Sequence, residues 1–223
     1  MLVDHFPLLG LRVRTPRLEL RLPSPEQLGA LADEAALGIH DPQVMPFLVP
    51  WTDRPPAEVA LGVIQHHWLR LANWTPQDWS LNLTVLCEGT VVGQQTVGAT
   101  DFAILREVNT GSWIGRRHHG RGIGTEMRAA VLHLAFVGLG AVEAVSAAFE
   151  HNLASRAVSR KLGYETDGIA RLAIRGAVST EHRLRLTRAA WERHRTVPVE
   201  IEGLEPCLPL LGCDSSTLST TPP

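Results

Sequence analysis

The chain has 223 residues, of which 44% are hydrophobic and 20% charged, and its formal net charge is −2. This length suits one domain with a sizeable core, and this composition argues against a disordered chain. A net charge near zero excludes the strongly basic balance of many nucleic-acid-binding proteins and gives no reason to expect an anionic membrane surface. We therefore expect a globular protein with no nucleic acid and no membrane among its partners.

The cysteines and histidines do not form a metal or disulfide pattern. Cys87, Cys207 and Cys213 lack CxxC spacing, and the two adjacent histidine pairs cannot share a helix face, so we expect no metal site. The first residues lack the basic and apolar regions of a signal peptide. The longest apolar stretch, residues 129–142, is too short to span a bilayer. These features predict a cytoplasmic protein.

The N-terminal half predicts one strand, two helices and an ordered loop. Leucines alternate with charged residues over 17–22, which indicates a strand with one solvated face. Ser24 followed by Pro25 predicts the start of a helix, and residues 57–71 predict a second one. Residues 40–56 between them carry several prolines and large apolar side chains, so we expect an ordered loop rather than a linker.

The second half predicts a hairpin and then alternating strands and helices. Its expected strands are 81–87, 91–99, 108–114, 141–149 and 183–188, and its expected helices are 123–137 and 152–162. This order predicts a mixed α/β sheet with helices on both faces. Residues 1–195 form the expected single domain, and 196–223 a proline-rich extension whose last ten or so residues we expect to be flexible.

A glycine-rich turn, His119-Gly-Arg-Gly-Ile-Gly124, lies between a predicted strand and a predicted helix. Glycines let several backbone N–H groups approach one ligand, and the helix N-terminus adds a positive dipole end, so a pyrophosphate is the expected guest. The run lacks the Gly-Lys-Ser/Thr of a Walker A loop, and Thr125 occupies the third glycine position of a GxGxxG fingerprint. A glycine-rich turn without a ligand is the simpler alternative.

This turn resembles the acyl-CoA pyrophosphate loop of the GNAT superfamily of N-acyltransferases, which has the form (Gln/Arg)-x-x-Gly-x-Gly/Ala. The pattern maps onto His119, Gly122 and Gly124, with histidine where Gln or Arg is usual. Residues 152–164 resemble the family's N-x-x-S/A … K-L-G-F/Y segment, one helix and one strand downstream. Residues 14–21 are similar to the opening strand of the RimJ/RimL branch, the ribosomal-protein alanine N-acetyltransferases and their small-amine relatives.

The resemblance implies the GNAT fold, a mostly antiparallel sheet of six to seven strands with helices on both faces and a V-shaped splay between the two central strands. It implies acetyl-CoA or another acyl-CoA, such as succinyl-CoA, as co-substrate, and no metal. The acceptor is expected to be a primary amine of a small molecule or a protein N-terminus, attacking directly in a ternary complex. A homodimer is common in this branch. The implied acyl-CoA contacts are Trp113, Ile114, Gly115, His119, Gly120, Arg121, Gly122, Ile123, Gly124, Thr125, Asn152 and Ser155.

The resemblance is less informative about catalytic groups. Many relatives carry a glutamate at the position of Asn109, so Glu107, two residues earlier on the same strand face, is the candidate base. A water relay or no dedicated base is an equal alternative. Ser159 occupies the slot where relatives often place a tyrosine acid, and it could protonate the CoA thiolate or simply lie on a polar helix face. In the family a bulged strand binds the thioester carbonyl, and Gly111 could permit that bulge.

Two further hypotheses remain open at this level. The large side chains Met45, Phe47, Trp51, Trp68 and Trp74 are candidates for the acceptor wall, although a plain core role is the alternative for the tryptophans. The loss of a glutamate at Asn109 also fits a catalytically weak GNAT protein that acts as an acyl-CoA sensor or interaction module.

Overall fold

The computed structural model describes residues 1–213 and contains the predicted strands and helices in the predicted order, together with others near both ends and within the chain. The helices are α1 (Leu2–His5), α2 (Pro25–Ala36), α3 (Pro56–Ala72), α4 (Phe102–Leu105), α5 (Ile123–His133), α6 (Leu153–Lys161) and α7 (Arg188–His194). The strands are β1 (Arg12–Arg14), β2 (Leu18–Arg21), β3 (Asp78–Cys87), β4 (Thr90–Thr100), β5 (Glu107–Ile114), β6 (Glu143–Phe149), β7 (Glu165–Ile174), β8 (Ala177–Thr187) and β9 (Glu200–Glu202).

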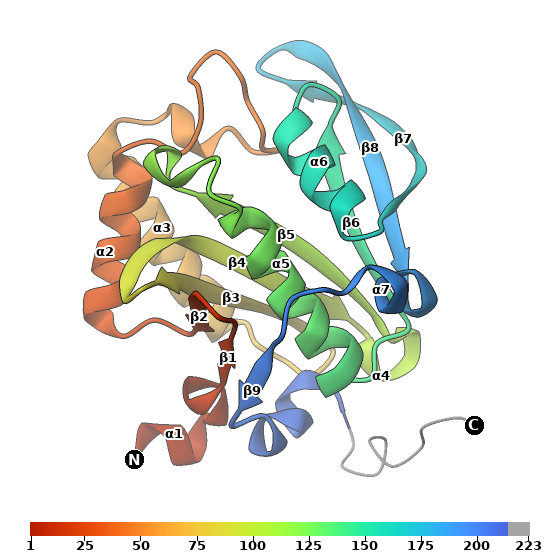
Figure 1. Cartoon of the computed structure of the whole chain (residues 1–223). Coiled ribbons are helices and arrows are strands. Elements are labelled where there is room, and N and C mark those ends of the chain that lie inside the picture. The colour runs from red at the N-terminus through yellow and green to blue at the C-terminus, as the bar shows by residue number, and fades with distance from the viewer. Residues whose placement is uncertain (214–223) are drawn as a thin grey trace.

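The strands form one sheet in the order β7-β8-β6-β5-β4-β3-β2-β1-β9 (Figure 1). Every neighbouring pair among the described residues is antiparallel except β5 and β6, which are parallel. The fold class is the predicted mixed α/β sheet, but it has nine strands rather than six or seven. Strands β1 and β9 have three residues each, too few for a periodic pattern, and the edge strand β7 is mostly exposed and lacks apolar alternation.

The predicted V-shaped splay lies between β5 and β6. The two strands pair only from Glu107 opposite Glu143 to Asn109 opposite Val145. Beyond that point β5 continues along β4 as far as Ile114, while β6 continues along β8. At the divergence the Ser146 hydroxyl donates to the Thr110 carbonyl oxygen at 3.0 Å, so the strands remain tied there and open toward their ends.

The two faces of the sheet differ in character. On one face Leu81, Leu83 and Val85 of β3 belong to the main core, which α5 covers. On the other face α2 and α3 pack over a smaller apolar cluster that includes Leu86. Consecutive residues of a strand point to opposite faces, so Val85 and Leu86 belong to different clusters.

Local signals set the helix ends as expected. The Ser24 side chain accepts from the backbone N–H of Gln27 at 3.2 Å and Pro25 opens α2, so this predicted start is confirmed. Helix α5 continues as a π-helical turn, Leu134–Gly138. None of the helices in residues 1–213 has the length and apolar character that a membrane crossing requires.

The region after residue 195 contributes to the same core. Strand β9 pairs with β1, and the following 3₁₀ segment, Glu205–Leu211, buries Cys207, Leu208 and Leu211 in the main cluster. Figure 1 shows this blue segment beside the red N-terminal one at the end of the sheet. The expected flexible tail of the last ten residues lies outside the described residues.

Candidate active site

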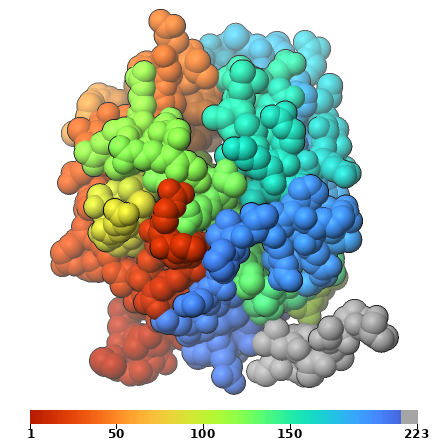
Figure 2. All heavy atoms as spheres, in the orientation of Figure 1, coloured from red at the N-terminus to blue at the C-terminus, as the bar shows by residue number. Residues whose placement is uncertain are grey.

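A cavity of about 520 Å³ lies where β5 and β6 diverge, and we name it the splay cavity. The end of β5 forms one wall, the glycine turn and the start of α5 form the second, and the first turns of α6 form the third. Figure 2 shows the green loop region and the cyan α6 on opposite sides of a hollow in this face. Each wall is one of the segments that the sequence motifs single out.

The glycine turn has the backbone geometry of an anion site. Gly120 and Gly122 have φ angles of 75° and 77°, a region that side chains rarely adopt. Gly122 is the N-cap of α5 and supplies no side chain, so the first N–H groups of this helix have no side-chain cap. A Cβ at Gly124 would lie 3.5 Å from Ile114 and 3.8 Å from Val158, which shows how closely α5 approaches β5 and α6. Backbone donors and a helix dipole therefore converge on the cavity.

Two ion-pair groups from distant parts of the chain hold this turn. On one side Arg17 donates to Glu126 at 2.7 Å and to the Arg121 carbonyl oxygen at 3.1 Å. On the other side the buried carboxylate of Glu34 in α2 is paired with Arg117 and lies 3.3 Å from His118 Nε2. Sequence analysis missed Arg17 and Glu34, because neither lies in the motif that it positions.

Gly115 has a structural role that its packing explains without a ligand. It does not line the splay cavity, and a Cβ on it would lie 1.7 Å from Glu34 Oε1. The absence of a side chain therefore lets the buried carboxylate pack against the strand end. The other predicted acyl-CoA contacts do line the cavity: Trp113, Ile114, His119, Gly120, Arg121, Gly122, Ile123, Gly124, Thr125, Asn152 and Ser155.

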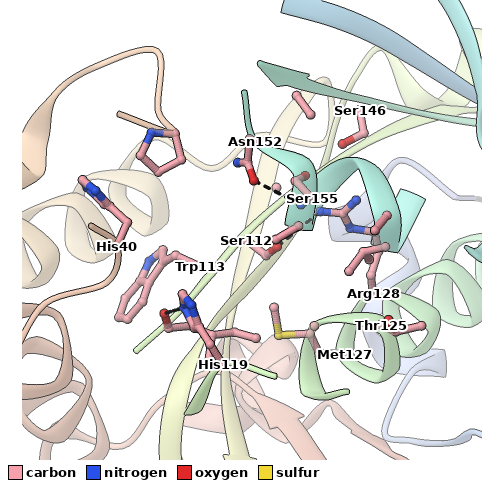
Figure 3. A pocket seen from close by; sticks show the side chains of 18 of the residues that line it. His40, Ser112, Trp113, His119, Thr125, Met127, Arg128, Ser146, Asn152 and Ser155 are labelled. Carbon is pink, nitrogen blue, oxygen red and sulfur yellow. Dashed lines mark hydrogen bonds between the residues drawn. The ribbon is translucent and has the colours of Figure 1, made fainter. Parts of the chain in front are cut away.

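Figure 3 labels His119, Asn152 and Ser155 among them, with their contacts. His119 Nε2 lies 3.0 Å from the Ile114 carbonyl oxygen, so the imidazole closes the end of β5. Asn152 Oδ1 accepts from the backbone N–H of Ser155 at 3.1 Å and caps α6. The cap explains an asparagine at this position by itself.

Strand β5 offers a free backbone edge to the splay cavity. Gly115 N–H donates to Val92 O at 2.9 Å, so the odd-numbered residues of this strand bond to β4. Alternate residues, including Ser112 and Ile114, direct their N–H and C=O groups to the opened side. No register shift occurs between β4 and β5, so the bulge expected at Gly111 is absent from this structure. The free edge arises from the splay instead.

A second cavity, of about 820 Å³, lies between α3 and the sheet, and we name it the sheet-face cavity. Its floor is polar and uncharged: Ser80 and Thr96 donate to Asn82 Oδ1 at 3.3 Å and 2.8 Å, and Gln94 donates to Thr96 at 3.3 Å. Asn82 is 3% exposed, and its Nδ2 has no hydrogen-bond partner among the described residues. This amide therefore has an unused donor at the cavity floor.

The predicted acceptor wall is only partly assembled. Phe47 and Trp51 line the sheet-face cavity. Met45 packs instead in a separate cluster with Phe149. Trp68 is 59% exposed and lies outside both cavities, and Trp74 donates to the Leu210 carbonyl oxygen at 2.8 Å at the edge of the main core.

The two cavities meet at one place on β5. Both are lined by Phe47 and by Thr110, Gly111, Ser112 and Trp113. A Cβ at Gly111 would meet no atom within 4 Å, so the strand leaves open space there. A molecule in the splay cavity and a molecule in the sheet-face cavity can therefore meet across this segment.

The two predicted catalytic side chains do not line either of these cavities. Glu107 Oε2 accepts from Arg185 Nη1 at 2.7 Å, and this bond is the main cause that raises the pKa of Arg185. Glu143 and Asp167 share the same guanidinium. Ser159 is 1% exposed, and its hydroxyl donates to the Ser155 carbonyl oxygen at 3.0 Å. Glu107 is thus held by Arg185, and Ser159 by contacts within α6 and with Arg128 of α5.

Arg128 of α5 lies at this junction, and sequence analysis missed it. It lines the splay cavity, donates to Ser159 Oγ at 2.8 Å, and has Nη2 at 3.4 Å from Ser112 Oγ (Figure 3). Burial lowers the pKa of its guanidinium. Its position beside Met127 on an otherwise ordinary helix gives no signal of this burial in the sequence. No group of three potential metal ligands occurs in the described part of the chain.

The model of the acetyltransferase (GNAT) domain family matches residues 17–165, more than half of the chain. The chain belongs to the GNAT acetyltransferase family. Enzymes of this family use acetyl-CoA.

Solved structures show the same fold for this GNAT acetyltransferase. A RimL ribosomal L7/L12 alpha-N-protein acetyltransferase in complex with coenzyme A matches with a TM-score of 0.60 and 16% identity, covering 79% of this chain and 97% of that one. Mycobacterium smegmatis RimJ in complex with CoA-disulfide matches with a TM-score of 0.60 and 20% identity, covering 82% of this chain and 90% of that one. A GNAT-family acetyltransferase from Bacillus anthracis matches with a TM-score of 0.62 and 14% identity, covering 79% of this chain and 98% of that one.

Proposed function

We propose that this enzyme transfers an acetyl or succinyl-type group from CoA to a primary amine of a small molecule or of a protein N-terminus. The junction of two cavities at Thr110–Trp113 carries the proposal. The splay cavity would hold the acyl-CoA, with the pyrophosphate on the turn at Gly120–Gly124 and the pantetheine amides on the free edge of β5. The sheet-face cavity would hold the amine.

We infer direct attack of the amine on the thioester in a ternary complex. Cavities that meet at one strand segment allow both substrates to be bound at the same time. An acyl-enzyme route would need an activated nucleophile at the junction, and no cysteine of the described residues lines either cavity. The hydroxyls there contact no base, because Thr110 is hydrogen-bonded to Tyr164 and Ser112 to Arg128. Burial also raises the pKa of Cys207 to about 11, which opposes formation of its thiolate.

Deprotonation of the amine is assigned to water rather than to Glu107. An α-amino group has a pKa of about 8 and needs little help near neutral pH. Glu107 is bound by Arg185 and lies outside both cavities. Backbone N–H groups of Ser112 and Ile114 are the candidates to bind the thioester carbonyl.

Thiol release from acetyl-CoA and from succinyl-CoA, measured against a panel of amines, tests this proposal. We expect release only with an amine present, and initial-rate lines that intersect when both substrates are varied. Parallel lines, or an acylated protein detected by mass spectrometry without an amine, would contradict direct attack.

A second candidate is an acyl-CoA sensor with little turnover. It is favoured by the uncharged Asn109 in the position of the family's glutamate and by the arginine-bound Glu107. Tight CoA binding by calorimetry without thiol release for any donor and amine would support this candidate. A homodimer and a cytoplasmic location stay predictions from the sequence.

A further inference from the structure

Arg128 is a buried cation for which the described residues supply no counter-ion. Its side chain is 5% exposed, and no carboxylate of residues 1–213 lies within ion-pair distance of it. Its guanidinium reaches Ser159 and Ser112, while its Nε has no hydrogen-bond partner in the described chain. Burying an unpaired charge lowers the stability of the folded state by roughly several kcal/mol. Its presence here therefore indicates that an anion binds or forms beside it.

The position of Arg128 identifies where that anion forms. Ser112 is one of the residues that line both cavities, and Arg128 Nη2 lies 3.4 Å from its hydroxyl oxygen. The side chain therefore lies at the end of the splay cavity where the amine and the thioester must meet. The glycine turn lies about one helical turn before Arg128, but the guanidinium contacts Ser112 and Ser159 and no residue of that turn.

Neighbouring groups do not provide the counter-charge either. Tyr164 shares a hydrogen bond with Thr110 at 3.1 Å, and burial raises the pKa of its hydroxyl, which keeps it neutral. Glu126 on the same helix is bound to Arg17. Lys161 and Glu181 also line the cavity, as an exposed and a half-buried side chain. The guanidinium is the buried charge nearest the junction.

We propose that Arg128 stabilises the CoA thiolate as it leaves, a catalytic role that rests on the proposed function above. The amine nitrogen bonds to the acyl carbon, the carbon–sulfur bond breaks, and sulfur departs with the electron pair as a thiolate beside the guanidinium. The amine proton goes to water. Arg128 gives up no proton, because an arginine is not deprotonated in proteins. Ser159 does not serve as the acid, since its proton is held by the Ser155 carbonyl oxygen.

The titration of CoA bound to the enzyme tests this role without any turnover. A thiolate absorbs in the ultraviolet and a thiol does not, so a pH titration of the complex gives the pKa of the bound thiol. A free thiol has a pKa of about 8.5, and a cation within about 4–6 Å lowers such a pKa by about 1–3 units. We expect a lowered thiol pKa in the wild type and a loss of that shift in Arg128→Met.

The variants separate this role from a structural one. Met has a similar length and removes an unpaired buried charge, so Arg128→Met is expected to fold. Arg128→Lys, which keeps the charge, should retain part of the shift. Arg121→Met, which removes a cation from the turn end of the same cavity, should weaken CoA binding and leave the thiol pKa unchanged. With acetyl-CoA and succinyl-CoA alike, kcat of Arg128→Met should fall about 100-fold.

Each other outcome has a distinct meaning. A wild-type complex in which the thiol has the pKa of free CoA overturns the role of Arg128 and needs no variant. A loss in Arg128→Met that is confined to succinyl-CoA overturns it as well, and assigns the arginine to a donor carboxylate. Failure of CoA to bind the wild type would instead contradict the proposed function itself.

Discussion

The two cavities that meet at β5 differ in the groups that face the bound molecule at the sheet. The splay cavity is lined by fixed cationic groups and backbone donors, among them Arg121, Arg128 and the turn at Gly120–Gly124. The floor of the sheet-face cavity consists of neutral amides and hydroxyls, namely Ser80, Asn82, Gln94 and Thr96. A site for a polyanion needs charge that does not depend on pH, whereas a site for an amine must accept the uncharged form that attacks. Four changes test this contrast.

The largest effect is expected for Gly120→Asp. Gly120 has a φ of 75° and open space around its Cβ position, and Asp and Asn both tolerate this backbone region. Aspartate brings a negative charge to the phosphate end of the splay cavity, so the Kd of CoA should rise about 100-fold. The matched variant Gly120→Asn should raise it less than about fivefold. If calorimetry shows the same loss of CoA affinity for both variants, the pyrophosphate does not bind at this turn.

The packing of α3 over the sheet-face cavity should lose stability in acid. Burial lowers the pKa of His67 on α3 to about 4, below the value of about 6.5 in an unfolded chain. The unfolded state then binds more protons between about pH 6.5 and 4, so stability falls as the pH decreases through this window. Between pH 7 and pH 4 the free energy of unfolding of His67→Gln should therefore fall by about 2 kcal/mol less than that of the wild type.

Urea unfolding at several pH values measures this difference. His66→Gln is the comparison on the same helix: burial lowers the pKa of His66 too, but His66 is the more exposed histidine, so this variant should recover a smaller part of the loss. A wild-type pH profile that coincides with that of His67→Gln would show that His67 titrates normally in the folded protein.

A smaller effect is expected for Thr96→Val at the floor of the sheet-face cavity. The hydroxyl donates to Asn82 at 2.8 Å and accepts from Gln94 at 3.3 Å, and losing it disturbs the polar floor at a cost of about 1 kcal/mol. The KM of the amine should rise about fivefold with the Kd of CoA unchanged. Thr100→Val, at the exposed end of the same strand, should change neither. A shift in CoA affinity alone would place the acceptor elsewhere.

The smallest effect is expected for Glu107→Gln. Because Glu107 is held by Arg185 and lines neither cavity, kcat should change less than about twofold and keep its pH profile. Glu143→Gln removes another carboxylate that is paired with Arg185 and should behave alike. A large fall in kcat for Glu107→Gln but not for Glu143→Gln, together with the loss of the acid limb of the pH profile of kcat, would identify Glu107 as the base.

Local motifs predicted the parts of the site that are local. The turn at Gly120–Gly124 and the cap at Asn152 depend on neighbouring residues, and both lie where the spacing indicates. Glu107 and Ser159 are positioned by Arg185 and Arg128, which are 78 and 31 residues away. No short pattern contains that information.

The fold shows the same division. Alternation and capping predicted the strands and helices of the central sheet, and the splay followed from the family resemblance. The sequence did not predict a sheet of nine strands, because β9 is held by its pairing with β1, which lies almost the whole chain away in sequence. The buried Arg128 gave no signal either, since burial of a charged helix residue depends on what packs over it.

The central claim is that an acyl-CoA in the splay cavity meets an amine at the junction on β5. A crystal structure of the complex with CoA tests it most directly. We expect the pyrophosphate on the backbone N–H groups of residues 120–124 and the sulfur at the opening between Thr110 and Trp113, beside Arg128. A CoA bound with its pyrophosphate on this turn but its sulfur directed away from that opening would contradict the account.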